Sequence, residues 1–212
     1  MTSAQDARFW DKVSRRYAKA KISDQGGYAR TLERTRALLG PEDRVLELGC
    51  GTGSTALRLA PHVQSYLATD ISSKMIAIAE GKTADSPVPD LSFRTATAES
   101  IVVEQAGFDA VLGFNYLHLL RDLESTLRHI HGMLRPGGLF ISKTPCLGDM
   151  NFLIRSVLLP GMRALGLAPH VSVLSKDILV RLIDAAGFEI LATEGHATKG
   201  KDTRPFIVAR KT

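Results

Sequence analysis

The glycine-rich string from Gly49 to Gly53 constrains the fold of this chain more than any other feature of the sequence. It directly follows a short apolar run, Val45 to Leu48, and precedes a segment that predicts a helix beginning near Ser54. Glycine lets the backbone turn sharply and approach a ligand closely, and the amides of a first helical turn point toward such a ligand. A strand, a glycine-rich turn and a helix in this order predict a nucleotide-binding unit of an α/β fold.

Short apolar runs alternate with amphipathic stretches from Arg44 to the C-terminus, a pattern typical of a doubly wound parallel sheet with helices on both faces. Seven such runs are enough for one seven-stranded sheet. The predicted strands are Val45 to Leu48, Tyr66 to Thr69, Leu91 to Arg94, Asp109 to Phe114, Leu139 to Lys143, Phe188 to Ala192 and Phe206 to Ala209.

Two apolar segments lie outside this alternation. A helical pattern before the first strand predicts an N-terminal helical lid over residues 1–40, and residues 41–212 then form the α/β domain. Within that domain, apolar residues repeat at spacings of three and four between Met150 and Leu165, which predicts a helical insert at about 148–170. Its apolar side chains would suit either a pocket wall or ordinary core packing.

Composition narrows the functional classes. The chain has 212 residues, and its two cysteines, Cys50 and Cys146, lack metal-ligand spacing, so we expect no metal site and no disulfide framework. We expect a cytoplasmic protein without a membrane span, because no long uncharged apolar run and no signal-peptide core occur. The net charge of +5 lies mainly in the terminal segments. Such a surplus could attract nucleic acid or anionic lipid, but we favour a solvated surface and leave peripheral lipid contact of the insert open.

Two acids define the expected cofactor. Glu47 stands two residues before the first glycine, where a carboxylate would repel a dinucleotide pyrophosphate and attract an ammonium group. S-adenosylmethionine carries an amino group and a sulfonium against one carboxylate, so Glu47 favours it over NAD. Asp70 ends the next predicted strand, where an acid binds the ribose hydroxyls of adenosine ligands. The alternatives are a strand-end Glu47 without a ligand and an Asp70 that caps the helix from Ser72.

Four motifs together resemble those of the class I S-adenosylmethionine-dependent methyltransferases, in particular small-molecule enzymes of the methyltransferase type 11 kind. They are Val45 to Gly53, Thr69 to Met75, Phe108 to Val111 and Leu134 to Gly138. The resemblance is close over about residues 40–145. It implies a Rossmann-like seven-stranded sheet with an antiparallel last strand, S-adenosyl-L-methionine as cofactor and S-adenosyl-L-homocysteine as product.

The resemblance also implies which residues bind the cofactor: Tyr17, Glu47, Gly49, Cys50, Gly51, Gly53, Asp70, Ile71, Met75, Thr97, Ala98, Glu99 and Asn115. The glycines would surround the methionine part, while Ile71 and Met75 would flank the adenine. Thr97 stands where the family often has an aspartate that accepts from the adenine amino group, and a hydroxyl can still accept one hydrogen bond. Tyr17 would fold over the cofactor from an N-terminal helix, or pack within that helix.

The acceptor is less well defined. His118, near the end of the fourth predicted strand, is the candidate general base, because a neutral imidazole accepts a proton near pH 7. A structural role for His118 is the alternative.

We expect a small, hydrophobic acceptor under the lid. A nucleic-acid methyltransferase is disfavoured, since Asn115 is not followed by the paired prolines of base-amino methyltransferases. A binding protein without turnover is a third possibility, and the oligomeric state is not predicted.

Overall fold

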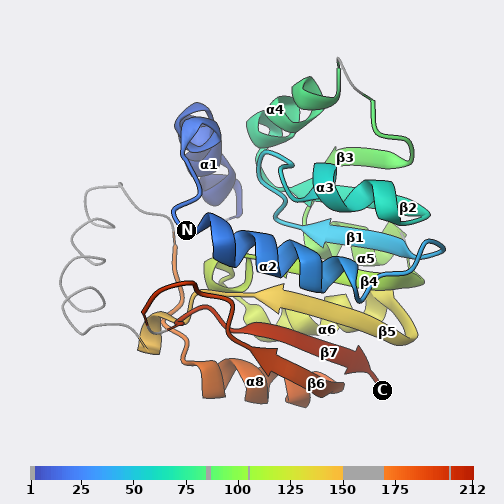
Figure 1. Cartoon of the computed structure of the whole chain (residues 1–212), viewed down its shortest axis with the longest axis vertical. Helices are drawn as coiled ribbons and strands as arrows, with labels where there is room; N and C mark the ends of the chain where they lie inside the picture. The colour runs from blue at the N-terminus through green and yellow to red at the C-terminus, as the bar shows by residue number, and fades with distance from the viewer. Residues whose placement is uncertain (1–2, 85–86, 105, 150–169, 201) are drawn as a thin grey trace.

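All seven predicted strands occur in the computed structural model, which describes residues 3–84, 87–104, 106–149, 170–200 and 202–212 (Figure 1). They form one sheet in the order β3-β2-β1-β4-β5-β7-β6. The strands are β1 (Arg44–Leu48), β2 (Ser65–Asp70), β3 (Leu91–Thr95), β4 (Phe108–Phe114), β5 (Leu134–Lys143), β6 (Phe188–Glu194) and β7 (Phe206–Lys211).

The pairing confirms a doubly wound sheet with an antiparallel last strand. Strands β1 to β5 pair in parallel with their neighbours, and β7 runs antiparallel to both β5 and β6. The chain order reverses between β1 and β4, which lie side by side. A crevice for a ligand is expected at the carboxyl ends of the strands on either side of such a reversal.

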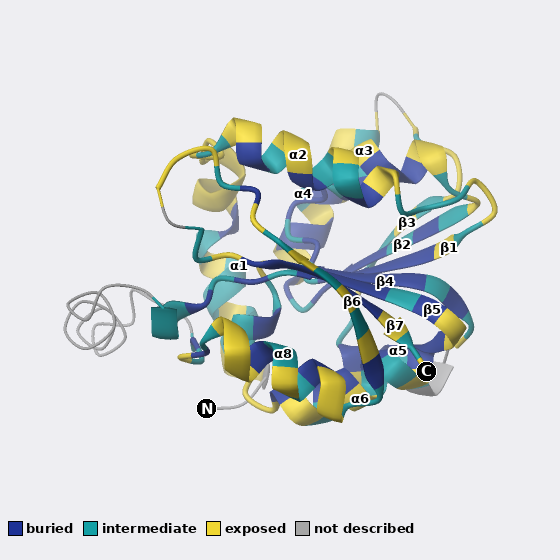
Figure 2. Ribbon diagram, turned by 60° about the horizontal axis from the view of Figure 1, so that its bottom comes forward, coloured by how far each residue is buried: buried dark blue, intermediate teal, exposed yellow. Residues whose placement is uncertain are grey.

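Helices cover both faces of the sheet (Figure 2). On one face lie α2 (Gln25–Arg36), α3 (Ala56–Leu59) and α4 (Ser73–Thr83), and on the other lie α5 (Ala98–Glu104), α6 (Leu123–Met133) and α8 (Lys176–Ala185). Successive strand residues point to opposite faces, so Val45 and Leu46 of β1 belong to two different core clusters. This two-sided burial explains why the strands read as continuous apolar runs.

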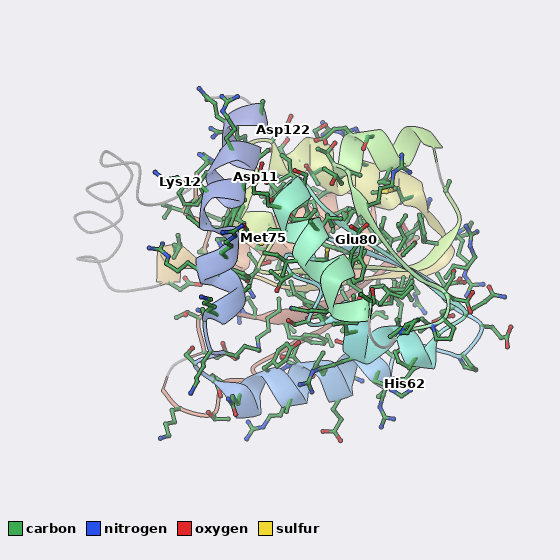
Figure 3. All side chains as sticks on the ribbon, turned by 90° about the horizontal axis from the view of Figure 1, so that it is seen from above. Asp11, Lys12, His62, Met75, Glu80 and Asp122 are labelled. Atoms are coloured by element: carbon green, nitrogen blue, oxygen red, sulfur yellow. The ribbon has the colours of Figure 1, made fainter. Side chains whose placement is uncertain are left out.

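The N-terminal helix α1 (Ser3–Lys19) lies beside α4 at the carboxyl end of the strands (Figure 1). The Asp11 carboxylate accepts from the Ser72 hydroxyl (2.6 Å) and the Lys74 amide (3.1 Å) at the start of α4 (Figure 3). Asp6 and Arg121 form a bidentate ion pair at 2.7 and 2.8 Å. Thus α1 is held at the carboxyl edge of the sheet, whereas α2 is part of a helical layer on the sheet, and the lid role of residues 1–40 stays a prediction. Nearly all of the expected helical insert lies outside the described residues.

Local structure departs from the sequence prediction at two points. The helix after the glycine-rich turn begins at Ala56, not near Ser54, and after four residues continues as a 3-10 turn that contains Pro61. Strand β5 begins at Leu134, before the Pro136-Gly137-Gly138 turn, and its ladder with β4 shifts register there. Among the described helices, none has both the length and the apolar character needed to cross a bilayer.

Candidate cofactor and acceptor site

Close packing explains two glycines of the turn. Gly49 and Gly53 adopt positive φ angles of 69° and 73°, which side-chain-bearing residues rarely adopt. A Cβ atom on Gly49 would lie 2.6 Å from Cδ2 of Tyr116, and one on Gly53 would lie 2.8 Å from the Phe93 ring. Gly49 therefore lets Tyr116 pack against the turn. Gly53 lets the turn pack against β3, and it lines neither of the cavities described below.

Side chains from later elements hold the turn in place. Asp70 accepts from the Gly51 amide (2.9 Å) through Oδ2 and from the Ser72 amide (2.8 Å) through Oδ1. The Lys82 ammonium on α4 donates to the Thr52 carbonyl (2.6 Å), the Thr52 hydroxyl (3.0 Å) and the Ser54 hydroxyl (3.1 Å). Burial raises the pKa of Asp70, while the two amide hydrogen bonds oppose that rise. The Gly51 amide is therefore used within the protein and is not free for a ligand, contrary to the simplest expectation for a glycine-rich turn.

A first cavity of about 270 Å³ opens beside the turn at the carboxyl ends of the strands. It brings together ten of the predicted cofactor residues: Tyr17, Gly49, Gly51, Asp70, Ile71, Met75, Thr97, Ala98, Glu99 and Asn115. These residues come from α1 and from the segments that follow β1, β2, β3 and β4. Trp10 and the Asp6–Arg121 pair also line this cavity, so α1 forms one of its walls.

A second cavity, of about 450 Å³, adjoins the first, and both are lined by Tyr17, Gly49, Phe114 and Asn115. Glu47 and Cys50 line this second cavity. Glu47 is 2% exposed, and its Oε2 accepts from the Tyr66 hydroxyl at 2.9 Å. Burial raises the pKa of Glu47 to about 7, and burial likewise raises the pKa of the Cys50 thiol. A cation beside Glu47 would favour its ionised form.

Thr97 has a local structural role at the edge of the first cavity. Its amide donates to the Ser100 hydroxyl (3.1 Å), and that hydroxyl donates back to the Thr97 carbonyl (2.9 Å). The Thr97 hydroxyl accepts from the Ser100 amide at 3.4 Å. These contacts stabilise the start of α5, and the same residue still faces the cavity.

Asn115 shapes the junction of the two cavities. It follows β4 with a φ of 51°, in the left-handed region that asparagine tolerates better than most residues. The backbone amide of Asn115 donates to the Lys143 carbonyl at 2.8 Å, which fixes the end of β4 to the end of β5. A strained backbone conformation held at a cavity edge is typical of functional sites.

His118 lines neither of these cavities. Burial, and to a smaller extent the Arg204 guanidinium, lowers the pKa of His118 to about 4, so the imidazole is neutral at pH 7. Within the described part of the chain, its buried Nδ1 has no hydrogen-bond partner. A neutral imidazole could accept a proton, but this placement does not favour the expected role as general base, which stays a prediction.

Several residues at the site were not singled out from the sequence. Tyr116 follows Asn115, but only the structure shows its ring against Gly49. Asp11 and Arg121 look like ordinary surface charges in the sequence. The sequence gives one indication for Lys143, because a cationic residue at the end of a buried strand is unusual. Nothing in the sequence indicates that Arg204 lies in the same cavity.

Comparison with known proteins agrees with this geometry. A family model described as a methyltransferase domain matches residues 15–193, which is most of the chain. The chain belongs to the class I S-adenosylmethionine-dependent methyltransferases. Members of this family use S-adenosylmethionine, so the family confirms the cofactor expected from Glu47 and Asp70.

Two curated relatives and one solved structure illustrate the breadth of this methyltransferase family. The highly reducing polyketide synthase ACTTS3 of Alternaria alternata is 32% identical over 70% of this chain, which spans only 7% of that protein. The uncharacterized methyltransferase YcgJ of Bacillus subtilis (strain 168) is 30% identical over 47% of this chain, and the match covers 40% of YcgJ. Magnesium protoporphyrin IX methyltransferase from Synechocystis PCC 6803, solved with bound S-adenosylhomocysteine, shares the fold over the full length of both chains (TM-score 0.74, 16% identity).

Proposed function

We propose that this methyltransferase binds the adenosine part of S-adenosylmethionine in the first cavity, with the methionine end reaching Glu47 at the edge of the second, and transfers the methyl group to a small acceptor in the remainder of the second cavity. The observation that carries the proposal is the shared boundary of the two cavities at Tyr17, Gly49, Phe114 and Asn115. A donor and an acceptor in these cavities would meet at that boundary. Holding two reactants in contact is a large part of what such an enzyme must do.

The first cavity suits the adenosine half of the cofactor. The Asp70 carboxylate accepts backbone hydrogen bonds from Gly51 and Ser72, and because a carboxylate has about four lone-pair sites it can also accept from a ribose hydroxyl. The apolar side chains of Ile71, Met75 and Ala98 line the same cavity and suit the faces of an adenine ring. These residues supply both the polar and the apolar contacts that an adenosine requires.

The boundary between the two cavities suits the sulfonium and methionine end of the cofactor. When bound, S-adenosylmethionine supplies an electrophilic methyl group on a sulfonium. Glu47, in the second cavity next to Gly49 and Cys50, can bind the ammonium of the methionine part. Tyr17 covers Gly51, since a Cβ there would lie 3.6 Å from its ring, and so shields the boundary from solvent. No side chain that lines the boundary is a strong base, which suits an acceptor that needs little help in losing a proton.

Two observations support a small acceptor. The second cavity is enclosed by α2, the end of β5 and the segment before β7, and its volume suits a small organic molecule. The polyketide synthase among the relatives is named for a class of small-molecule products. The apolar insert that we expected to cover the acceptor falls almost entirely outside the described residues.

The test is formation of S-adenosylhomocysteine by the purified protein with pooled small acceptors, with RNA and with protein mixtures. We expect turnover only in the small-molecule pools, and at sub-saturating cofactor the Asp70→Asn variant should be slower by about 30- to 100-fold. Turnover only with RNA or protein would contradict the proposal. Tight binding of the cofactor without turnover in any pool would support a binding protein.

A further inference from the structure

Three cationic side chains line the second cavity. Lys143 at the end of β5 and Arg204 just before β7 lie near each other, and the third, Lys21, is exposed after α1. Burial lowers the pKa of Lys143. The nearby Asp202 carboxylate opposes this shift, the Arg204 guanidinium adds to it, and Asp24 opposes it more weakly. Arg204 is exposed, and its guanidinium has no hydrogen-bond or ion-pair partner among the residues that the structure describes. Two neighbouring cations of this kind would both gain from an anion placed between them.

The Lys143 ammonium is held in position by a buried polar network. Its Nζ donates to the Thr31 hydroxyl on α2 at 2.8 Å, and that hydroxyl donates to the Gly27 carbonyl at 2.8 Å. Nδ1 of His196 lies 3.0 Å from the same hydroxyl, and the His196 ring stacks on Phe206 at 4.5 Å between centroids. An ammonium has three donors, so two remain for a ligand. Little side-chain entropy would be lost on binding.

The two aspartates in the same cavity are already committed to the backbone. Asp24 accepts from the Gly27 and Thr198 amides and the Thr198 hydroxyl, which lowers its pKa to about 2. Asp202 accepts from the amides of His196, Ala197 and Arg204, which lowers its pKa against the opposing effect of burial. These carboxylates fix the loop before β7. They favour the charged form of Lys143 electrostatically, but among the described residues neither makes a hydrogen bond or ion pair with the Lys143 ammonium or the Arg204 guanidinium.

We propose that Lys143 and Arg204 bind an anionic group on the methyl acceptor, which is then a small molecule with an apolar body and a carboxylate or similar anion. The apolar body would contact Ile22, Leu32 and Phe114, which line the same cavity. This inference rests on the proposed function, since it assigns the substrate class of the acceptor cavity.

The methionine carboxylate of the cofactor is the other possible source of such an anion. Lys143 is on β5, which is separated from β1 and its glycine-rich turn by β4. Two strand spacings amount to about 10 Å, which places the start of the Lys143 side chain well away from the turn. The position therefore favours the acceptor as the source.

A matched pair of fluorescent probes tests the anion requirement on protein saturated with S-adenosylhomocysteine. 8-Anilinonaphthalene-1-sulfonate carries an anionic group, and N-phenyl-1-naphthylamine has the same rings without it. We expect the sulfonate to bind at least tenfold more tightly. Lys143→Ala and Arg204→Gln should each weaken sulfonate binding about tenfold, the effect of one charge-assisted hydrogen bond, and leave the neutral probe unchanged.

Two further variants sharpen the result. Thr31→Val keeps the Lys143 ammonium but removes the hydroxyl that accepts its hydrogen bond. We expect the affinity for the sulfonate to fall about threefold and the affinity for the neutral probe to stay unchanged. Lys199→Ala removes the same charge from an exposed position of the loop before β7, outside the cavity, and should have no effect. Equal affinities for the two probes, or sulfonate binding that Lys143→Ala and Arg204→Gln do not change, would overturn the proposal.

A cofactor titration separates the two sources of the anion and the two proposals. S-adenosylmethionine and 5′-methylthioadenosine differ in the methionine end, so a loss of affinity for the first alone in Lys143→Ala and Arg204→Gln would assign the cations to the cofactor and overturn the inference. Unchanged affinity for both ligands supports it. Failure of the wild-type protein to bind S-adenosylhomocysteine would instead contradict the proposed function.

Discussion

The two cavities are built in different ways. Apart from its α1 wall, the first takes its lining from residues 48–126, in the loops that follow four consecutive strands. The second shares the glycine-rich turn with the first, but it is completed by α2, the end of β5 and the segment before β7, which are far apart in the chain. The donor half therefore depends on short motifs with defined backbone geometry, whereas the acceptor half depends on tertiary packing. Substitutions should separate the two halves.

The largest effect is expected for Gly49→Ala. The new Cβ would lie 2.6 Å from Tyr116, at a φ of 69°, so strain and overpacking should together lower the free energy of unfolding by about 3 kcal/mol and abolish binding of S-adenosylhomocysteine. Urea denaturation and calorimetric titration measure the two effects. Gly137→Ala is the control, because Gly137 has a φ of 76° and no atom within 4 Å of a Cβ. A similar loss in both variants would show that packing against Tyr116 is unimportant.

Glu47→Gln should reveal a buried acid through its pH dependence. The pKa of Glu47 is about 7 in the folded protein against an ordinary value of 4.5, so its favourable contribution is complete below pH 4.5 and is lost as pH rises through 7. Wild-type protein should therefore lose up to about 3 kcal/mol of stability between pH 5 and pH 8 relative to the variant. Urea denaturation across this range measures the difference. Parallel stability curves would contradict a buried, protonated Glu47.

Asp70→Asn should weaken cofactor binding by about 30- to 100-fold. The amide is a neutral acceptor with one oxygen, so the ribose hydroxyls lose a hydrogen bond to a charged group, at a cost of about 2–3 kcal/mol of binding free energy. Asp24→Asn makes the same change in the second cavity, where the carboxylate also accepts from backbone amides. Calorimetry should show normal S-adenosylhomocysteine binding for Asp24→Asn. Equal losses in the two variants would mean that the cavities are not separable.

Arg121→Ala should have the smallest effect. The ion pair with Asp6 joins α1 to the wall of the first cavity, but both side chains are partly exposed, so we expect a loss of at most about threefold in S-adenosylhomocysteine affinity. Trp10, the only tryptophan, lies on α1 in that cavity and reports binding by fluorescence. Arg210→Ala removes a comparable pair with Glu189 on the far strands and is the control. A difference between these variants that persists in 1 M salt would argue against an ion-pair effect.

The sequence places most of the residues expected at the donor half on one edge of the sheet because its signals are local. The glycine string and Asp70 lie at strand ends, and the strand pattern alone brings those ends to one edge of the sheet. His118 lines neither cavity, because periodicity places a residue near a strand end but does not show which way its ring points; its role as general base stays a prediction. Thr31, Lys143 and Arg204 meet only after three distant segments have packed, and no spacing in the sequence indicates that contact.

The hydrogen bonds from Lys82 limit the transfer of the glycine-rich motif into other proteins. Three acceptors on Thr52 and Ser54 converge on one ammonium that the chain supplies from α4, roughly thirty residues downstream. The motif is thus not a self-contained module. A graft that carried only the segment from Val45 to Gly53 into a new scaffold would leave the two Thr52 acceptors without this donor. A transferable unit would have to extend at least from β1 through α4 and include Asp70 on the way.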